Sequence, residues 1–368
     1  MRAIWFAAAF VLLGVGACSG RKQKPPPEPP ATPHDASVVS STPDGAALIA
    51  IPPAPPLPDL PVGLPPPPSP LFTAATPTPE LVALGELLFW DTRLSTTNTL
   101  SCASCHVPAD GFSGATRQLT AAGKPNLRKA PALVNLAWSK ELGWDGRSTT
   151  MEQWLSPHVR GQLGEDLATS VPRIAELPVY KANFARSQTA TMDLATTARR
   201  ALESYVLTRY AGNSQWDKVM SGTDPARDQP DFSLSAGRQL FDGKAQCAVC
   251  HTPPLFTDGD YHRIGLVAVA DEGRGRVDKA AKEQGAFRTP TLRGAAARKG
   301  FFHDASASTL AAAIDWHLAG GVGQKADKSI IDPALTKISL TPDERAALQT
   351  YVEGLTEQAP PPTAPALP

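Results

Sequence analysis

Cysteine is scarce in this chain, with only five among its 368 residues. Four of the five fall into two short motifs, and the fifth, Cys18, follows an apolar stretch near the start of the chain. No cysteine remains to build a disulfide framework, which excludes the class of small secreted domains that disulfides hold together.

An excess of charge is missing as well, because 35 lysines and arginines balance 35 aspartates and glutamates. Nucleic-acid binding needs a clustered basic excess, so the composition indicates no nucleic-acid partner. A convincing strand alternation is also lacking, whereas apolar residues repeat at helical spacing in several stretches. The sequence therefore predicts a mainly α fold. The expected helices begin at Pro79, Ser235 and Pro342, and two more cover residues 191–210 and 309–318.

The start of the chain has the pattern of an export signal. Arg2 precedes an apolar run at residues 3–15, which is shorter than the about 20 residues that span a bilayer. Residues 1–17 are therefore predicted to be a signal peptide. Residues 15–18 resemble a bacterial lipobox in which Cys18 is acylated, and the alternative is an ordinary signal peptide with a chance cysteine. The lipobox predicts a lipid-anchored protein on the periplasmic side of a Gram-negative bacterium, and Ser19 favours the outer membrane over the inner one.

Proline is the residue in excess, with 38 copies that crowd at the two ends of the chain. Residues 18–78 are too rich in proline to bury a core and favour extended polyproline II conformations. We therefore expect a disordered tether at 18–78 and a disordered tail at 359–368.

The motif Cys-x-x-Cys-His occurs twice, at residues 102–106 and 247–251. Two thiols at this spacing match the two vinyl groups of haem, and the following histidine is placed to bind the iron. A zinc site or a thioredoxin-like redox pair is the alternative for such a pair of cysteines. The motifs predict two covalently attached haems c, held by Cys102, Cys105 and His106 and by Cys247, Cys250 and His251.

The sequence around the two motifs repeats. A Gly-x-x-Leu-Phe pattern precedes each motif, at residues 85–89 and 237–241, and a proline and a phenylalanine follow each one. This repeat predicts two cytochrome-c-like haem domains in tandem, at 79–222 and 223–358, with the boundary in the Gly/Pro/Asp-rich run at 221–231.

A longer series of motifs resembles the bacterial di-haem cytochrome c peroxidases and the related MauG-type enzymes. The resemblance covers residues 79–356 and includes Trp144-Asp145-Gly146-Arg147 and the stretches 91–95, 287–293 and 301–304. It implies that the first haem is catalytic, with His106 as the proximal ligand, and that the second haem passes electrons inward. It also implies that Glu152 is the distal carboxylate that moves a proton between peroxide oxygens; the alternative for Glu152 is a solvated helix residue.

The distal ligands depart from the family pattern. Many members hold a histidine in the loop after the first motif, where this chain has Ala122, so we expect an open catalytic iron. His158 is a fallback ligand, although a surface position after Pro157 is preferred. The second haem takes Met or Tyr in the family, but Met220 is the last methionine, and His317 matches that ligand position. The resemblance thus implies ligation by two histidines, His251 and His317, and the alternative for His317 is an exposed helix position.

Further family positions carry weaker predictions. Trp138 and Trp144 are candidates to relay electrons between the haems, or are core residues. Arg293 is predicted to bind a haem propionate or to form a plain salt bridge. His303 and His262 match positions near the second haem and are expected to form hydrogen bonds rather than to bind the metal. The family's calcium positions fall on Lys129, Arg298 and Gly300, and two cationic side chains disfavour a calcium ion.

The leading functional hypothesis is a lipid-anchored peroxidase that reduces hydrogen peroxide to water. A small c-type cytochrome or a cupredoxin would donate the electrons. One alternative is a MauG-type oxidase of a protein or organic substrate, and another is an electron-transfer lipoprotein without catalytic activity. The sequence leaves the oligomeric state open, a homodimer included.

Overall fold

A computed structural model describes residues 52–68, 76–223, 232–266, 271–321 and 331–368. All of these described residues belong to one compact unit. The predictions of a signal peptide, of acylation at Cys18 and of the first part of the tether concern residues outside those described. In the described part of the chain, no helix is both long and apolar enough to cross a membrane.

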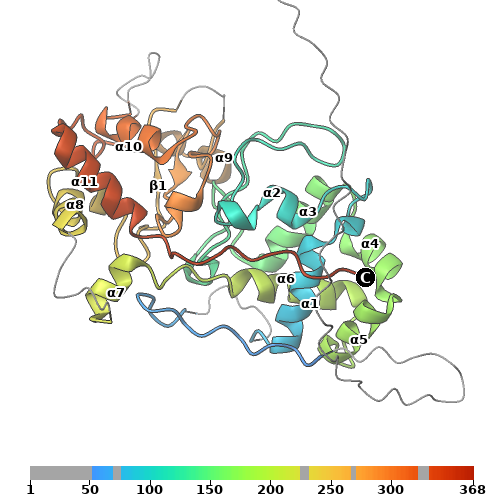
Figure 1. The fold of residues 1–368 in the computed structure, drawn as a ribbon. Coiled ribbons are helices and arrows are strands. Elements are labelled where there is room, and N and C mark those ends of the chain that lie inside the picture. Colours follow the sequence, from blue (N-terminus) through green and yellow to red (C-terminus); the bar gives the residue numbers. More distant parts are fainter. Residues whose placement is uncertain (1–51, 69–75, 224–231, 267–270, 322–330) are drawn as a thin grey trace, which may run out of the picture. The chain divides into compact units, whose positions relative to one another are not determined.

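The structure is mostly helical, which confirms the predicted mainly α character (Figure 1). Among the described residues, six helices precede residue 210 and five follow it. The first set is α1 (Pro79–Trp90), α2 (Cys102–Cys105), α3 (Met151–Leu163), α4 (Leu167–Ala175), α5 (Pro178–Ser187) and α6 (Leu194–Leu207). The second set is α7 (Gln215–Ser221), α8 (Phe232–Asp242), α9 (Gly275–Asp278), α10 (Leu310–Leu318) and α11 (Pro342–Glu353).

The predicted helices are present, with some shifted ends. Thr78 caps α1 by accepting a hydrogen bond from the N–H of Leu81, and Thr341 and Glu344 form the capping box of α11. The helix expected at 191–210 is shorter, and α8 begins three residues before Ser235. One antiparallel pair of short strands, β1 (Tyr261–His262) and β2 (Phe287–Arg288), was not predicted, because two-residue strands leave no alternation to detect.

The sequence repeat is also a structural repeat. In the first half α1 packs on α6, and in the second half α8 packs on α11. Gly85 lies against Ala201 of α6, and Gly237 lies against Ala347 of α11. In each pair a side chain on the glycine would overlap the carbonyl oxygen of the facing alanine. The repeated glycines therefore let two helix backbones approach closely.

Each half contains a cluster of three aromatic rings, and the distances between the ring centres are nearly the same in the two halves. The ring centres of Phe89 lie 6.0 Å from Phe112 and 5.1 Å from Tyr205. In the second half, Phe241 lies 6.0 Å from Phe256 and 5.2 Å from Tyr351. These rings belong to two separate apolar cores, which comprise Leu84, Leu88, Leu155, Ala201 and Leu202 in the first half and Leu234, Ala295, Leu348, Val352 and Leu355 in the second.

Part of the predicted tether is bound to the folded body, so the expectation of a free tether is wrong for residues 52–68. Val62 exchanges hydrogen bonds with Asn213, at 2.8 Å to its side chain and 3.0 Å to its backbone. The carbonyl of Gly63 accepts a hydrogen bond of 2.9 Å from Arg293. The tail at 359–368 has no helix or strand, but Arg93 donates a hydrogen bond of 3.0 Å to the carbonyl of Pro368, so the chain end returns to the first-half helices (Figure 1).

Candidate haem sites

The first Cys-x-x-Cys-His motif lines a cavity of about 360 Å³. Cys102 and Cys105 lie on the short helix α2, whose N-terminus is capped by a capping box of Ser101 and Ser104. His106 follows as the C-terminal cap of this helix. The cavity walls come from α1, α3, α6 and the loop at 126–133, so both thiols and the imidazole face one mostly apolar space.

Hydrogen bonding orients the His106 ring. Nδ1 lies 2.9 Å from the carbonyl oxygen of Pro131 and 3.4 Å from that of Phe112. Since Nδ1–H donates to these carbonyls, Nε2 is the nitrogen that faces the cavity. Burial lowers the pKa of His106 to about 4, which keeps the ring neutral and able to bind a metal.

The second motif repeats this arrangement in a cavity of about 190 Å³. Nδ1 of His251 donates to the carbonyl of Phe256 at 3.1 Å, and burial lowers the pKa of His251 to about 4. Phe112 and Phe256 both have a positive φ, of 55° and 54°. This shared backbone conformation turns the same carbonyl toward the histidine in each motif.

The structure places His317 on the wall opposite His251, as ligation by both histidines requires. His317 lies in the last turn of α10, and its ring centre is 6.4 Å from that of His251. Its Nδ1 donates to the carbonyl of Ala313, one turn earlier, at 2.8 Å. Nε2 is therefore free to face the cavity, and the alternative of an exposed helix position does not hold.

The residues of both cavities suit haem better than zinc. A structural zinc site needs four ligands, whereas the described residues contain one group of three, formed by Cys250, Asp258 and His262. His262 is already paired, with Nε2 2.9 Å from Asp258 and Nδ1 2.6 Å from Asp332. The hydrogen bond to Asp258 is the main cause that raises the pKa of His262 to about 11. A protonated imidazole cannot bind a metal, so His262 has the hydrogen-bonding role that the sequence predicted.

Trp144 lies between the two cavities and lines both of them. Its Nε1 donates to the carbonyl of Lys129 at 2.9 Å, and its own carbonyl accepts from the N–H of Arg288 at 2.9 Å. Arg128 also joins the halves, because it pairs with Asp271 at 2.6 Å. Trp138, the other predicted relay, lines neither haem cavity and contacts Tyr210 edge-on at 5.6 Å.

Glu152 does not reach the first cavity, so the structure contradicts its predicted position. It occupies the first turn of α3, its side chain is 63% exposed, and it pairs with Arg199 at 3.4 Å. The residues of α3 that line the cavity do not include Glu152; they are Met151, Trp154, Leu155, His158, Val159, Gln162 and Leu163. The exposure of Glu152 and its pairing with Arg199 therefore place the carboxylate outside the cavity.

His158 is the residue that sequence reasoning misplaced most. The expected surface position is wrong, because the ring is half-buried and lines the first cavity. Its ring centre lies 6.2 Å from that of His106. Pro157 was the reason for expecting a surface position, yet it lies inside α3, and the helix continues to Leu163. The helical spacing from Met151 was the available signal.

Two other predicted contacts differ from expectation. Arg293 is 1% exposed and binds Asp217 through both terminal nitrogens, at 2.6 and 2.9 Å, while Nε donates to the carbonyl of Pro254. The guanidinium nitrogens thus donate to protein oxygens. The alternative of a plain salt bridge holds, and the predicted contact with a haem propionate does not. His303 stacks on Phe287 at 3.6 Å instead of forming a ring hydrogen bond within the described residues.

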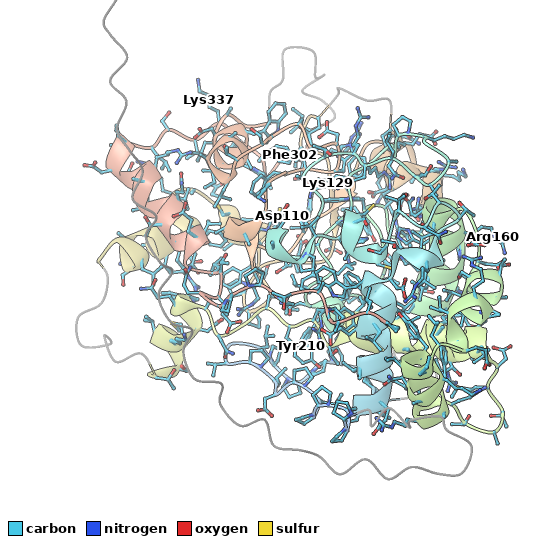
Figure 2. All side chains as sticks on the ribbon, turned by 45° about the vertical axis from the view of Figure 1, so that its right-hand side comes forward. Asp110, Lys129, Arg160, Tyr210, Phe302 and Lys337 are labelled. Carbon is cyan, nitrogen blue, oxygen red and sulfur yellow. The ribbon has the colours of Figure 1, made fainter. Side chains whose placement is uncertain are left out.

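Lys129, one of the three positions that the resemblance assigned to a calcium site, is buried. Lys129 is 3% exposed, and its Nζ donates to the hydroxyl of Ser113 at 2.6 Å and to the carbonyl of Gly114 at 3.0 Å. Burial lowers its pKa to about 7. The backbone N–H of Lys129 donates to the carbonyl of His303 at 2.8 Å; Figure 2 labels Lys129 and Phe302, the residue before His303. Lys129 therefore connects the two halves beside Trp144.

Comparison with known proteins places this arrangement among di-haem enzymes. The family described as "Di-haem cytochrome c peroxidase" matches residues 79–225. Methylamine utilization protein MauG of Methylorubrum extorquens is 32% identical over 297 residues, covering 79% of this chain and 82% of the relative. Cytochrome c551 peroxidase of Nitrosomonas europaea is 27% identical over 254 residues, covering 66% and 74%. The crystal structure of a MauG-like protein associated with microbial copper homeostasis matches with a TM-score of 0.72 at 25% identity, covering 82% of this chain and 95% of that one.

Proposed function

The chain belongs to the family of di-haem cytochrome c peroxidases and MauG, and from this premise we propose that it reduces hydrogen peroxide to water at the first cavity. The chain is a haem oxidoreductase, and the haems, when bound, supply the electron exchange with peroxide. Two electrons and two protons convert each peroxide into two waters. The electrons enter at the second haem from a small c-type cytochrome or a cupredoxin.

The observation that carries this proposal is the connection between two equivalent sites. Each cavity collects two thiols and one oriented imidazole, held by Pro131 in the first and by Phe256 in the second. Trp144 lines both cavities and is fixed at both ends by backbone hydrogen bonds. This position supports Trp144, rather than Trp138, as the residue through which the sites exchange electrons.

Peroxide-dependent oxidation of a reduced small cytochrome or cupredoxin by the haem-loaded protein tests the proposal. We expect turnover in the wild type, slower turnover in Trp144→Phe, and turnover at the wild-type rate in Trp138→Phe. Haem oxidation by peroxide without any oxidation of either donor would count against a donor peroxidase.

A MauG-type oxidase is the second candidate, and the 32% identity to MauG favours it. In this case peroxide oxidises the haems, and a protein or organic molecule then returns them to the ferric state. Recovery of the ferric spectrum upon addition of such a reductant, without donor turnover, would support this candidate over the first.

We also propose that the mature chain is anchored through acylated Cys18 on the periplasmic side of the outer membrane. The apolar run at 3–15 and the residues around Cys18 support this. Incorporation of labelled fatty acid and recovery in outer-membrane fractions are expected for the wild type. A Cys18→Ser variant should incorporate no label, and an unlabelled wild type would contradict the proposal.

A further inference from the structure

Each haem cavity has a second imidazole opposite the proximal one, at nearly the same distance. The ring centres of His106 and His158 are 6.2 Å apart, and those of His251 and His317 are 6.4 Å apart. A metal bound to two imidazoles holds each nitrogen at about 2 Å, and each ring centre lies roughly 1 Å behind its nitrogen, which gives a separation of about 6 Å. Both pairs therefore have the spacing of two ligands on opposite faces of one metal.

The surroundings of His158 leave its nitrogens available. The ring stacks on Trp154 at 5.3 Å with the planes 22° apart, and the guanidinium of Arg147 lies 4.7 Å from the Trp154 ring centre. No hydrogen bond to either His158 ring nitrogen is found within the described residues. A polar ring on the wall of an apolar cavity is expected to have a partner, and a group bound in the cavity can supply it.

The two distal histidines differ in how they are held. Nδ1 of His317 donates a hydrogen bond to the carbonyl of Ala313, whereas the ring of His158 stacks on Trp154 and has no ring hydrogen bond to any described residue. Stacking allows the ring to slide or turn more readily than a hydrogen bond of defined direction. The first site therefore has the more easily displaced imidazole.

We propose that His158 is the second axial ligand of the first haem in the resting ferric protein, and that it moves aside to admit peroxide. The inference rests on the haem loading that the proposed function requires. It replaces the expectation of an iron that is open at rest. The second haem stays closed by His317, so only the first site exchanges its distal ligand.

Electron paramagnetic resonance of the fully oxidised, haem-loaded protein tests this assignment. The wild type should show two low-spin ferric haems per chain. In His158→Ala one of them should become high-spin, and added imidazole should return it to low spin. Arg160→Gln is the matched control on α3 and should keep both low-spin signals. Arg160 is 69% exposed, is not among the residues that line the cavity, and is labelled at the edge of the molecule in Figure 2.

If His158→Ala binds too little haem to be measured, a second variant that keeps a metal ligand at this position tests the same assignment. His158→Met should remain low-spin and raise the potential of the first haem, since methionine ligation raises haem potentials. One high-spin haem in the wild type, or an unchanged spin state in His158→Ala, would overturn the assignment. Spin states are read without turnover, so an inactive protein with two low-spin haems would reject the peroxidase proposal and leave the ligand assignment intact.

Discussion

Replacing the two repeated helix glycines by alanine tests whether close backbone approach fixes both halves. A Cβ atom on Gly85 would lie 2.8 Å from the Cβ of Tyr205, and one on Gly237 would lie 2.6 Å from the Cβ of Tyr351. Carbon atoms in good contact are about 3.5–4.0 Å apart. Each added methyl would also overlap a backbone carbonyl, which cannot turn away as a flexible side chain could. The helix pair must therefore separate by about 1 Å.

The sign of the effect follows from two opposing terms. Alanine is better than glycine in a helix by about 1 kcal/mol, and overpacking a core costs about 1–3 kcal/mol or more. The rigid backbone oxygens place Gly85 and Gly237 at the upper end of this range. We therefore expect Gly85→Ala and Gly237→Ala to lower the free energy of unfolding by about 2 kcal/mol each, or somewhat more.

Gly161 supplies a matched control. It lies inside α3, and nothing would lie within 4 Å of a Cβ atom there. Gly161→Ala should raise the free energy of unfolding by about 0.5–1 kcal/mol. Urea denaturation at equal haem loading measures the three midpoints. A stabilised Gly85→Ala or Gly237→Ala would refute the close-approach argument.

Three further predictions concern charged residues. Asp217→Asn leaves the charge of the buried Arg293 unpaired, and it should lower the free energy of unfolding, measured by urea denaturation, by about 3–5 kcal/mol. As a control, Glu176→Gln breaks an exposed pair with Lys181 and should not move the urea midpoint. Burial lowers the pKa of Lys129 from 10.5 to about 7. Between these pH values the unfolded chain binds one more proton than the folded chain, so the free energy of unfolding should rise with pH across this window. The Lys129→Met variant should lack this rise. Glu152→Gln should keep wild-type peroxide turnover, because the carboxylate lies outside the cavity; a large loss would restore its predicted role in proton transfer.

The sequence predicted the features that short motifs encode. The two haem motifs, the Gly-x-x-Leu-Phe repeat and the helix starts at Pro79 and Pro342 all involve residues close in sequence, and the structure places them as expected. Contacts between distant residues were beyond such reasoning. Arg293 and Asp217 are 76 positions apart, and no local pattern indicates that this arginine faces a carboxylate instead of a cofactor.

The segment at 52–68 illustrates a limit of composition. Proline-rich sequence predicts an extended chain without a core of its own, and the segment is indeed without helix or strand. Composition does not exclude that an extended chain binds to another surface. Here the carbonyl of Gly63 and the backbone of Val62 find partners in Arg293 and Asn213. Hydrogen bonds to the folded body thus hold this part of the extended backbone. The residues of the segment itself do not indicate these bonds.

The first cavity shows why a proline is weak evidence against a buried site. Pro157 lacks an N–H and forgoes the hydrogen bond to the residue four positions earlier, yet α3 continues through it and carries His158 to the wall facing His106. The second half reaches the same ring separation from α10, which contains no proline. There His317 gains a hydrogen bond to Ala313 that His158 lacks. Two halves built on one repeat thus hold these second imidazoles differently, and the proposed opening of the first site rests on this difference.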